Sequence, residues 1–238
     1  LIKSMDRETY GNVLLKGTYI PGGPMLPPSL DYAFDELDKM NPDKYDVEAA
    51  KKLLADAGWK DPDGDGFVDK DGKNLELNFT FYSGRAELPL FAEAVQSDAK
   101  KVGIKVNLKN VDYNIIFDIG KKGEYDLLIS NILTEQAGDP EFFMNVYFRT
   151  NKDGNTPENA SGYSNPEYDA LSEKLSGEFD PAKRRDIIIQ MEKIMMNDAG
   201  TVVLGYPKTN LVSSKNIANA NIYPCDYYWV TKDITPAK

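Results

Sequence analysis

Residues 61–69 have the spacing of a calcium-binding loop. Asp61, Asp63, Asp65 and Asp69 match ligand positions of an EF-hand, whose carboxylate and carbonyl oxygens suit a hard divalent cation. The position of the bidentate Glu that closes such a site is occupied by Gly72, and an alternating, strand-like stretch follows where an EF-hand has a helix. The sequence therefore favours two tight turns, in "DGDG" and "KDGK", around a short strand, over a structural calcium site.

The other residue types leave little catalytic chemistry. The chain has no histidine, which excludes Ser-His-Asp and Cys-His constellations and the commonest zinc ligand, and its single cysteine, Cys225, cannot form an internal disulfide. Carboxyl pairs such as Asp126 with Asp139 are available for acid–base catalysis, but nothing places them across a scissile bond. We therefore expect a protein that is not an enzyme and needs no cofactor.

Composition and charge point to a globular binding protein. The 238 residues carry a formal net charge of -10, which argues against a nucleic-acid partner, and 14 Tyr and 10 Phe offer aromatic surface for a small ligand. No run approaches the roughly 20 apolar residues of a membrane helix. The opening "LIKSMDRETY" has no signal peptide and is typical of the middle of an amphipathic helix, so we expect a fragment of a longer polypeptide.

The predicted elements alternate between strands and helices. Asp46 is a helix N-cap with Gly58 after the helix, and Gly103 closes a later helix. Helices are expected at 2–16, 47–57, 87–103, 113–124, 166–177 and 181–199; strands at 75–82, 104–111, 125–132 and once or twice within 201–217; a Pro/Gly loop at 18–30, a short aromatic segment at 139–148 and a polar loop at 149–165. This order predicts an α/β fold, a mixed sheet with crossover helices.

Several motifs stand in a family-specific order. They are "DRETYGNVLLKGTYIPGGPMLPP", the stretches 45–82 and 87–131, "GDPEFFMNVYF" and "GYSNPEYDAL". Together they resemble the C-terminal lobe of the solute-binding proteins of ABC importers, in the branch for oligopeptides, dipeptides and nickel. The resemblance covers nearly the whole chain and implies one lobe of a type II periplasmic-binding-protein-like fold.

The resemblance also implies an architecture and a location. Residues 1–200 are expected to form the C-terminal ligand-binding lobe, and residues 201–238 to form terminal strands and a tail that return towards a first lobe, which is encoded by about 250 residues upstream. The expected partners are a small-molecule solute, held in the cleft between the lobes, and an ABC permease with its ATPase. An extracytoplasmic location is expected, in the periplasm or as a cell-surface lipoprotein whose only membrane contact is a lipid anchor on the N-terminal part.

The loop after the strand at 125–132 is the leading candidate for ligand contact, because ligands of open α/β sheets lie at the carboxyl ends of the strands. Asp139 before Pro140 has the alternative role of capping the next helix, and Phe142 or Phe143 the alternative of packing in the core. The candidate ligand-binding residues are Thr134, Glu135, Gln136, Gly138, Asp139, Phe142, Tyr147, Arg149 and, in "YSGRAEL", Arg85, with no metal ligands among them.

Gln136 distinguishes between two ligand classes. Peptide-binding relatives place an acidic residue at the position of Gln136, four before the Pro, to pair with the peptide's amino group, and a neutral amide offers an ammonium no charge. A pre-formed nickel or other metal chelate would need no protein ligand, only aromatic walls and groups such as Arg85 and Arg149 for its carboxylates. We therefore expect a chelate-binding protein. The alternative is a peptide-binding protein, in which Glu135 or a residue of the other lobe supplies the charge. A ligand-sensing lobe of a regulator is a third possibility, because fold does not determine function.

Overall fold

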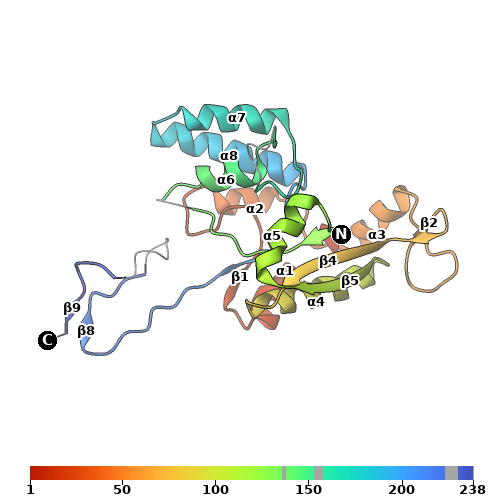
Figure 1. Cartoon of the computed structure of the whole chain (residues 1–238), viewed down its shortest axis with the longest axis horizontal. Helices are drawn as coiled ribbons and strands as arrows, with labels where there is room; N and C mark the ends of the chain where they lie inside the picture. The colour runs from red at the N-terminus through yellow and green to blue at the C-terminus, as the bar shows by residue number, and fades with distance from the viewer. Residues whose placement is uncertain (136–137, 153–157, 223–229, 238) are drawn as a thin grey trace.

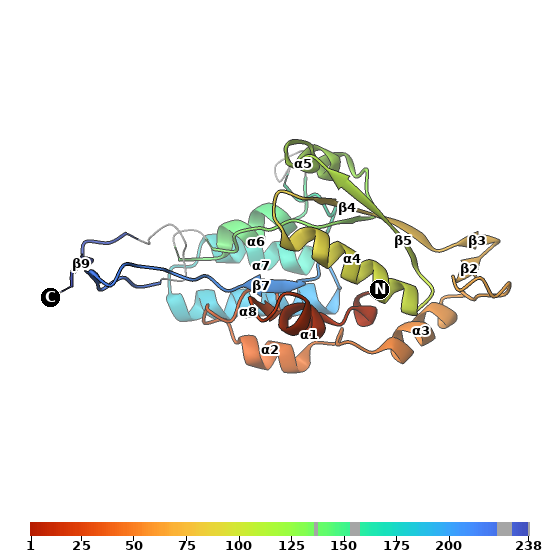
Figure 2. The same cartoon turned by 90° about the horizontal axis from the view of Figure 1, so that it is seen from below.

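The computed structural model describes residues 1–135, 138–152, 158–222 and 230–237. Its centre is a three-stranded parallel sheet in the order β5-β4-β6, formed by β4 (Glu76–Tyr82), β5 (Lys105–Val111) and β6 (Leu127–Leu128). The crossover helices α4 (Glu87–Lys101) and α5 (Tyr113–Lys122) connect these strands and lie on either side of the sheet (Figure 2). The predicted α/β class and the strand–helix–strand–helix–strand order are confirmed, and the antiparallel pairs lie in separate small sheets.

The sequence around the sheet explains its burial. Phe79 and Phe81 of β4 point to one face of the sheet and Tyr82 to the other, yet all three are buried, because helices cover both sides of this central strand. Gly103 lies between α4 and β5 with φ +80°, a conformation that glycine adopts without steric cost. One hydrophobic cluster joins the sheet to α4, with Phe91, Val95 and other residues of one helix face at its centre.

A second hydrophobic cluster is built by three helices, α6 (Glu141–Phe148), α7 (Pro166–Ser176) and α8 (Pro181–Asn197). Asn165 and Asp180 cap α7 and α8, and each is followed by Pro at the first helical position. These helices stack beside the sheet (Figure 1), and Met25 and Leu26 of the Pro/Gly loop insert between them. The aromatic segment predicted at 139–148 thus contains a short helix.

The N-terminal part is more broken than the sequence predicts. The expected helix at 2–16 consists of η1 (Ile2–Ser4), α1 (Arg7–Thr9) and the π-helical turn η2 (Tyr10–Leu14). The break has a tertiary cause: Asp98 of α4 accepts hydrogen bonds from the Asp6 backbone N–H at 2.9 Å and from the Tyr10 hydroxyl. A short helix, α2 (Phe34–Met40), follows the Pro/Gly loop where the sequence predicts no element.

The Asp-rich stretch connects a helix to the sheet. Asp46 caps α3 (Val47–Asp56), as predicted, and β2 (Asp69–Lys70) pairs with β3 (Lys73–Asn74) around a turn in which Asp71 and Gly72 both have positive φ. The side chain of Asp61 accepts the backbone N–H groups of Gly64 and Gly66, so this region forms the turns that the sequence favours.

The C-terminal segment leaves the body of the lobe. β7 (Gly205–Pro207) pairs antiparallel with β1 (Tyr19–Pro21), and the chain then runs outward as an extended arm that ends in the pair β8 (Ile217–Ala218) and β9 (Thr235–Pro236) (Figures 1 and 2). The residues of β7 are therefore paired with the N-terminal part of the chain before the arm begins. No helix in the described ranges has the length and apolarity needed to cross a membrane.

Candidate functional site

The carboxyl ends of three parallel strands meet at one edge of the sheet, and the segments that leave them are 83–87, 112–113 and 129–135. This edge is where open α/β sheets hold ligands. Asn131, after β6, donates to Glu87 at the start of α4 at 3.5 Å. The hydroxyl of Tyr19 from β1 lies against the same two side chains, and its burial, followed by the neighbouring Glu87, raises the pKa of the phenol. Tyr19, Glu87 and Asn131 thus form a polar cluster at this edge.

Glu135 is the most unusual side chain of the segment after β6. It is 3% exposed, and neither oxygen of its carboxylate has a hydrogen-bond partner among the described residues. The Oγ of Ser130, five residues earlier, is also buried and without a partner there. A buried carboxylate without partners costs several kcal/mol relative to one in water. Such a group is expected to receive its partner from a ligand or from another part of the protein.

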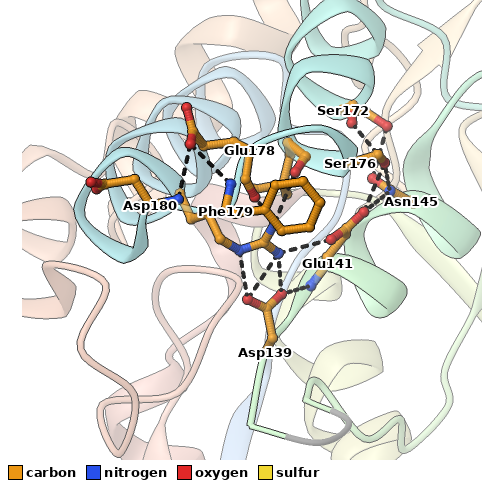
Figure 3. Close-up of polar contacts among 10 residues, drawn as sticks. Asp139, Glu141, Asn145, Ser172, Ser176, Glu178, Phe179 and Asp180 are labelled. Carbon is orange, nitrogen blue, oxygen red and sulfur yellow. Dashed lines mark hydrogen bonds and ion pairs between the residues drawn. The ribbon is translucent and has the colours of Figure 1, made fainter.

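The other predicted ligand-binding residues of this loop differ in burial and in their partners. Thr134 is partly buried next to Glu135, and Gly138 is exposed with φ +83°. Gln136, on which the chelate prediction depends, lies outside the described residues. Asp139 accepts the backbone N–H of Glu141 at 2.8 Å and forms an ion pair with Arg184 of α8 (Figure 3). Asp139 therefore has the helix-starting role that the sequence offers as the alternative to ligand contact.

The aromatic and cationic candidates also differ in exposure and in their partners. Phe142 is 49% exposed, whereas Phe143 is buried in the α6–α8 cluster. Tyr147 is half-buried, and burial raises its pKa. Arg149 donates to Glu173 of α7 at 2.7 Å, so its guanidinium is already paired, whereas the exposed Arg85 makes no ion pair with any described residue.

Sequence reasoning missed an aromatic group formed by the end of β4 and the start of α5. The rings of Tyr82 and Tyr113 meet edge to face with centroids 5.0 Å apart, and Phe117 packs on Tyr113 at 5.6 Å in the same way. Tyr113 is 52% exposed at the start of α5, and it is close enough to Tyr147 to affect its pKa. The sequence contains a signal for this group, because Tyr113 follows β5 just as the predicted loop follows β6.

The two carboxylates considered for acid–base chemistry do not form a pair. Asp126 precedes β6 and accepts the backbone and side-chain N–H groups of Asn78 at 2.7 and 3.0 Å. Asp139 follows β6 and is bound to Arg184. Each carboxylate is therefore engaged by its own partners, at opposite ends of β6.

The calcium-like loop brings three acidic side chains together. The carboxylate oxygens of Asp61, Asp63 and Asp65 lie within 4.8 Å of one another, and all three residues are exposed. Exposed acidic groups of this kind are common without an ion, and the backbone N–H groups of Gly64 and Gly66 already bind the oxygens of Asp61 within the loop. The cluster is therefore explained by the turns that it stabilises.

Curated proteins with similar sequences include an oligopeptide-binding protein and a nickel-binding protein. The oligopeptide-binding protein AppA of Bacillus subtilis is 26% identical over 243 residues, covering 98% of this chain and 43% of the relative. The nickel-binding protein NikA of Staphylococcus aureus is 27% identical over 187 residues, covering 79% of the chain and 35% of the relative. The chain thus spans less than half the length of these curated relatives.

Solved structures share the fold. The structure of AppA from Bacillus subtilis in complex with a nonapeptide superposes with a TM-score of 0.75 at 23% identity, covering 100% of this chain and 46% of that one. NikA from Brucella suis in complex with Fe(III)-EDTA gives a TM-score of 0.72 at 23% identity, covering 87% and 41%. At this level of identity the likeness establishes the fold alone.

The family itself follows from a match over most of the sequence. Residues 1–155 fit the model described as "Bacterial extracellular solute-binding proteins, family 5 Middle", which includes the sheet, its crossover helices and α6. The lobe expected from the motifs and the extracytoplasmic location agree with this match. The chain belongs to the bacterial extracellular solute-binding proteins of family 5.

Proposed function

We propose that the chain is the C-terminal lobe of the solute-binding component of an ABC importer and that it holds its solute against the carboxyl edge of the sheet. The family match supports the class of protein, and the parallel order β5-β4-β6 supports the place. The second lobe closes the cleft from the other side, because the chain spans less than half of its relatives. The arm after Pro207, which leaves this lobe, is proposed to return to the other one.

The carboxylate of Glu135, which is buried and has no hydrogen-bond partner in the described ranges, decides between the ligand classes. A ligand that places an ammonium group against Glu135 replaces the water that the carboxylate lost on folding, and a hydrogen bond to a charged group contributes about 1.5–3 kcal/mol. A short peptide with a free amino terminus has such a group. Its side chains would meet Tyr113 and Phe117, which are exposed in the first part of α5, after β5.

A metal chelate is the second candidate. It is the ligand predicted from Gln136, and the exposed Arg85 and the aromatic group around Tyr113 support it, because they suit an organic carrier with carboxylates. Arg149 is paired with Glu173, and the carboxylate of Glu135 would repel an anionic chelate, so this arrangement favours the peptide.

The remaining functional statements follow from the same proposal. The partners are an ABC permease and its ATPase, and the protein binds its solute without converting it. The family to which the chain belongs consists of solute-binding transport proteins. A sensing lobe of a regulator would share this fold, and it would be recognised by a DNA-binding or transmembrane segment elsewhere in the polypeptide.

Calorimetric titration of the full-length protein, in which this lobe is joined to the second one, tests the proposal. The probes are a mixed pool of tripeptides and, separately, nickel with L-histidine, both in buffer from which other divalent cations have been removed. Binding of the tripeptides without metal is the expected result. Binding that requires both nickel and histidine supports the chelate, and binding of neither probe refutes the proposed solute classes.

A further inference from the structure

Arg184 on α8 donates hydrogen bonds from all three nitrogen atoms of its guanidinium, and Figure 3 labels its partners Asp139 and Glu141. The Nε and Nη2 atoms donate to both carboxylate oxygens of Asp139 at 2.9–3.1 Å, and Nη2 also donates to Glu141 at 2.8 Å. Nη1 donates to the backbone carbonyls of Leu175 and Glu178, each at 2.8 Å. The side chain is 17% exposed, so these bonds are largely shielded from water.

These bonds join three places in the chain. Leu175 and Glu178 lie at the end of α7, where helix carbonyls lack partners within the helix, and Asp139 and Glu141 lie where the segment from β6 enters α6. Hydrogen bonds from Arg184 and Ser176 hold the pKa of Glu141 below its ordinary value, although burial opposes them. Arg184 therefore fixes the entry into α6 against the α7–α8 pair through charge-assisted hydrogen bonds.

The opposite end of the same segment is fixed by the sheet. Ile129 donates its backbone N–H to the carbonyl of Thr80 in β4 at 3.1 Å, and Asn131 contacts Glu87 of α4. Glu135 lies between these two anchored ends, four residues before Asp139. A carboxylate that has no partner in the described parts of the chain gains hydration by moving out to water, and the anchors on either side of Glu135, at Asn131 and at Asp139, oppose that movement.

We propose that Arg184 is a positioning residue for the solute's cationic group: by binding Asp139 and Glu141 it keeps the carboxylate of Glu135 buried and available before the ligand arrives. This inference rests on the proposed function. A site that is held ready does not lose affinity to ordering its own loop on binding. The planar guanidinium is required, because a lysine has the charge but cannot bind Asp139 in a bidentate manner while reaching two carbonyls.

The test compares Arg184→Lys with Arg185→Lys in the full-length protein. Arg185 is the matched control because it is the next residue of α8 and also binds an acidic residue, the exposed Asp31, at 3.1 Å. Calorimetric titration uses the tripeptide pool and the same pool acetylated at the amino terminus. For wild type we expect tighter binding of the free-amine pool.

Arg184→Lys is expected to lower the affinity for the free amine at least tenfold and to change the affinity for the acetylated pool less than threefold, so that the preference for the amine is lost. Arg185→Lys keeps both affinities within twofold. A loss that is equal for both pools, or no loss, overturns the positioning role. If Arg184→Lys does not fold, Asp139→Asn, which weakens the same ion pair from the loop side while retaining an acceptor for Glu141, is measured against the same two outcomes.

The wild-type titrations separate this inference from the proposed function. If wild type binds neither pool, the proposed peptide-binding function fails and the inference fails with it. If wild type binds both pools equally, an ammonium is not recognised and the role given to Arg184 is refuted. If wild type prefers the amine and Arg184→Lys preserves that preference, only the inference about Arg184 fails.

Discussion

Glu192 on α8 gives the protein a pH-dependent stability that can be calculated from its surroundings. Its side chain is fully buried, one oxygen accepts the backbone N–H of Leu26 at 2.9 Å, and the other has no partner among the described residues. The phenols of Tyr32, Tyr168 and Tyr206 lie near enough to interact with it, and they are neutral at physiological pH. Burial raises the pKa of Glu192 from 4.5 to about 8, against the opposing backbone hydrogen bonds.

The sign follows from comparing the folded and unfolded states. In the unfolded chain Glu192 loses its proton near pH 4.5, whereas in the folded protein it keeps the proton until about pH 8. The stabilising contribution of the proton is therefore complete below pH 4.5 and is lost as pH rises to about 8. With about 1.4 kcal/mol for each tenfold change in proton affinity, the difference amounts to on the order of 5 kcal/mol.

The perturbation is Glu192→Gln, which keeps a carbonyl acceptor for Leu26 and removes the ionisation. Urea unfolding from about pH 5 to pH 8 should show that the free energy of unfolding of wild type falls relative to that of the variant by several kcal/mol. Glu36→Gln, at an exposed position of α2, is the control and should run parallel to wild type. A difference between wild type and Glu192→Gln that stays constant over this range would refute the account of Glu192.

Two further predictions concern the backbone and the acidic loop. Gly22→Ala would place a Cβ on the carbonyl of Val203 beside the β1–β7 pair, so we expect a loss of about 3 kcal/mol in urea unfolding, whereas Gly177→Ala, whose Cβ would meet the Lys174 carbonyl oxygen at an ordinary contact distance of 3.9 Å, should change stability by less than about 1 kcal/mol. A comparable effect of both substitutions would contradict the close packing at Gly22. Calcium titration at the loop of Asp61 should show no saturation below about 1 mM, because Gly72 stands where the bidentate Glu is needed. Saturation in the micromolar range would show that the site closes by other ligands.

Local signals in the sequence predicted the central part of the fold. Asp46 caps α3, because the start of a helix needs a side-chain acceptor for its free backbone N–H groups. Gly103 ends the turn after α4, because that position needs a residue that tolerates positive φ. Both requirements are local and do not depend on the surrounding structure. The alternation in β4 and the period of α4 indicated the core faces in the same way.

Tertiary contacts determine the parts of the fold that local sequence signals did not predict. The predicted helix at 2–16 breaks where Asp98, which is 92 residues away from Asp6 in the chain, takes the Asp6 N–H. The strand expected at 125–132 is only Leu127–Leu128, because the chain turns away from β4 after Ile129 to reach α6. α2 has only Leu37 buried, so it carries no apolar period by which it could be recognised.

The candidate site was also predicted in part by local signals and determined in part by tertiary contacts. A strand end followed by polar residues identified the loop that contains Glu135, but the burial of that carboxylate without a partner depends on packing from elements far apart in the sequence. The ion pair that occupies Asp139 comes from Arg184, 45 residues later, and the one that occupies Arg149 comes from Glu173. Neither pairing has a local sequence signal, so both residues were predicted as ligand contacts on position alone.

The pairing of Glu135 with a cationic group of the solute is tested most directly by a two-by-two calorimetric comparison. Wild type and Glu135→Gln are each titrated with the tripeptide pool and with its amino-acetylated form, with Glu124→Gln, an exposed acid between α5 and β6, as the control variant. We predict that acetylation weakens binding to wild type by about 2 kcal/mol more than binding to Glu135→Gln. Equal effects of acetylation on wild type and on Glu135→Gln would contradict the recognition of the solute by this carboxylate.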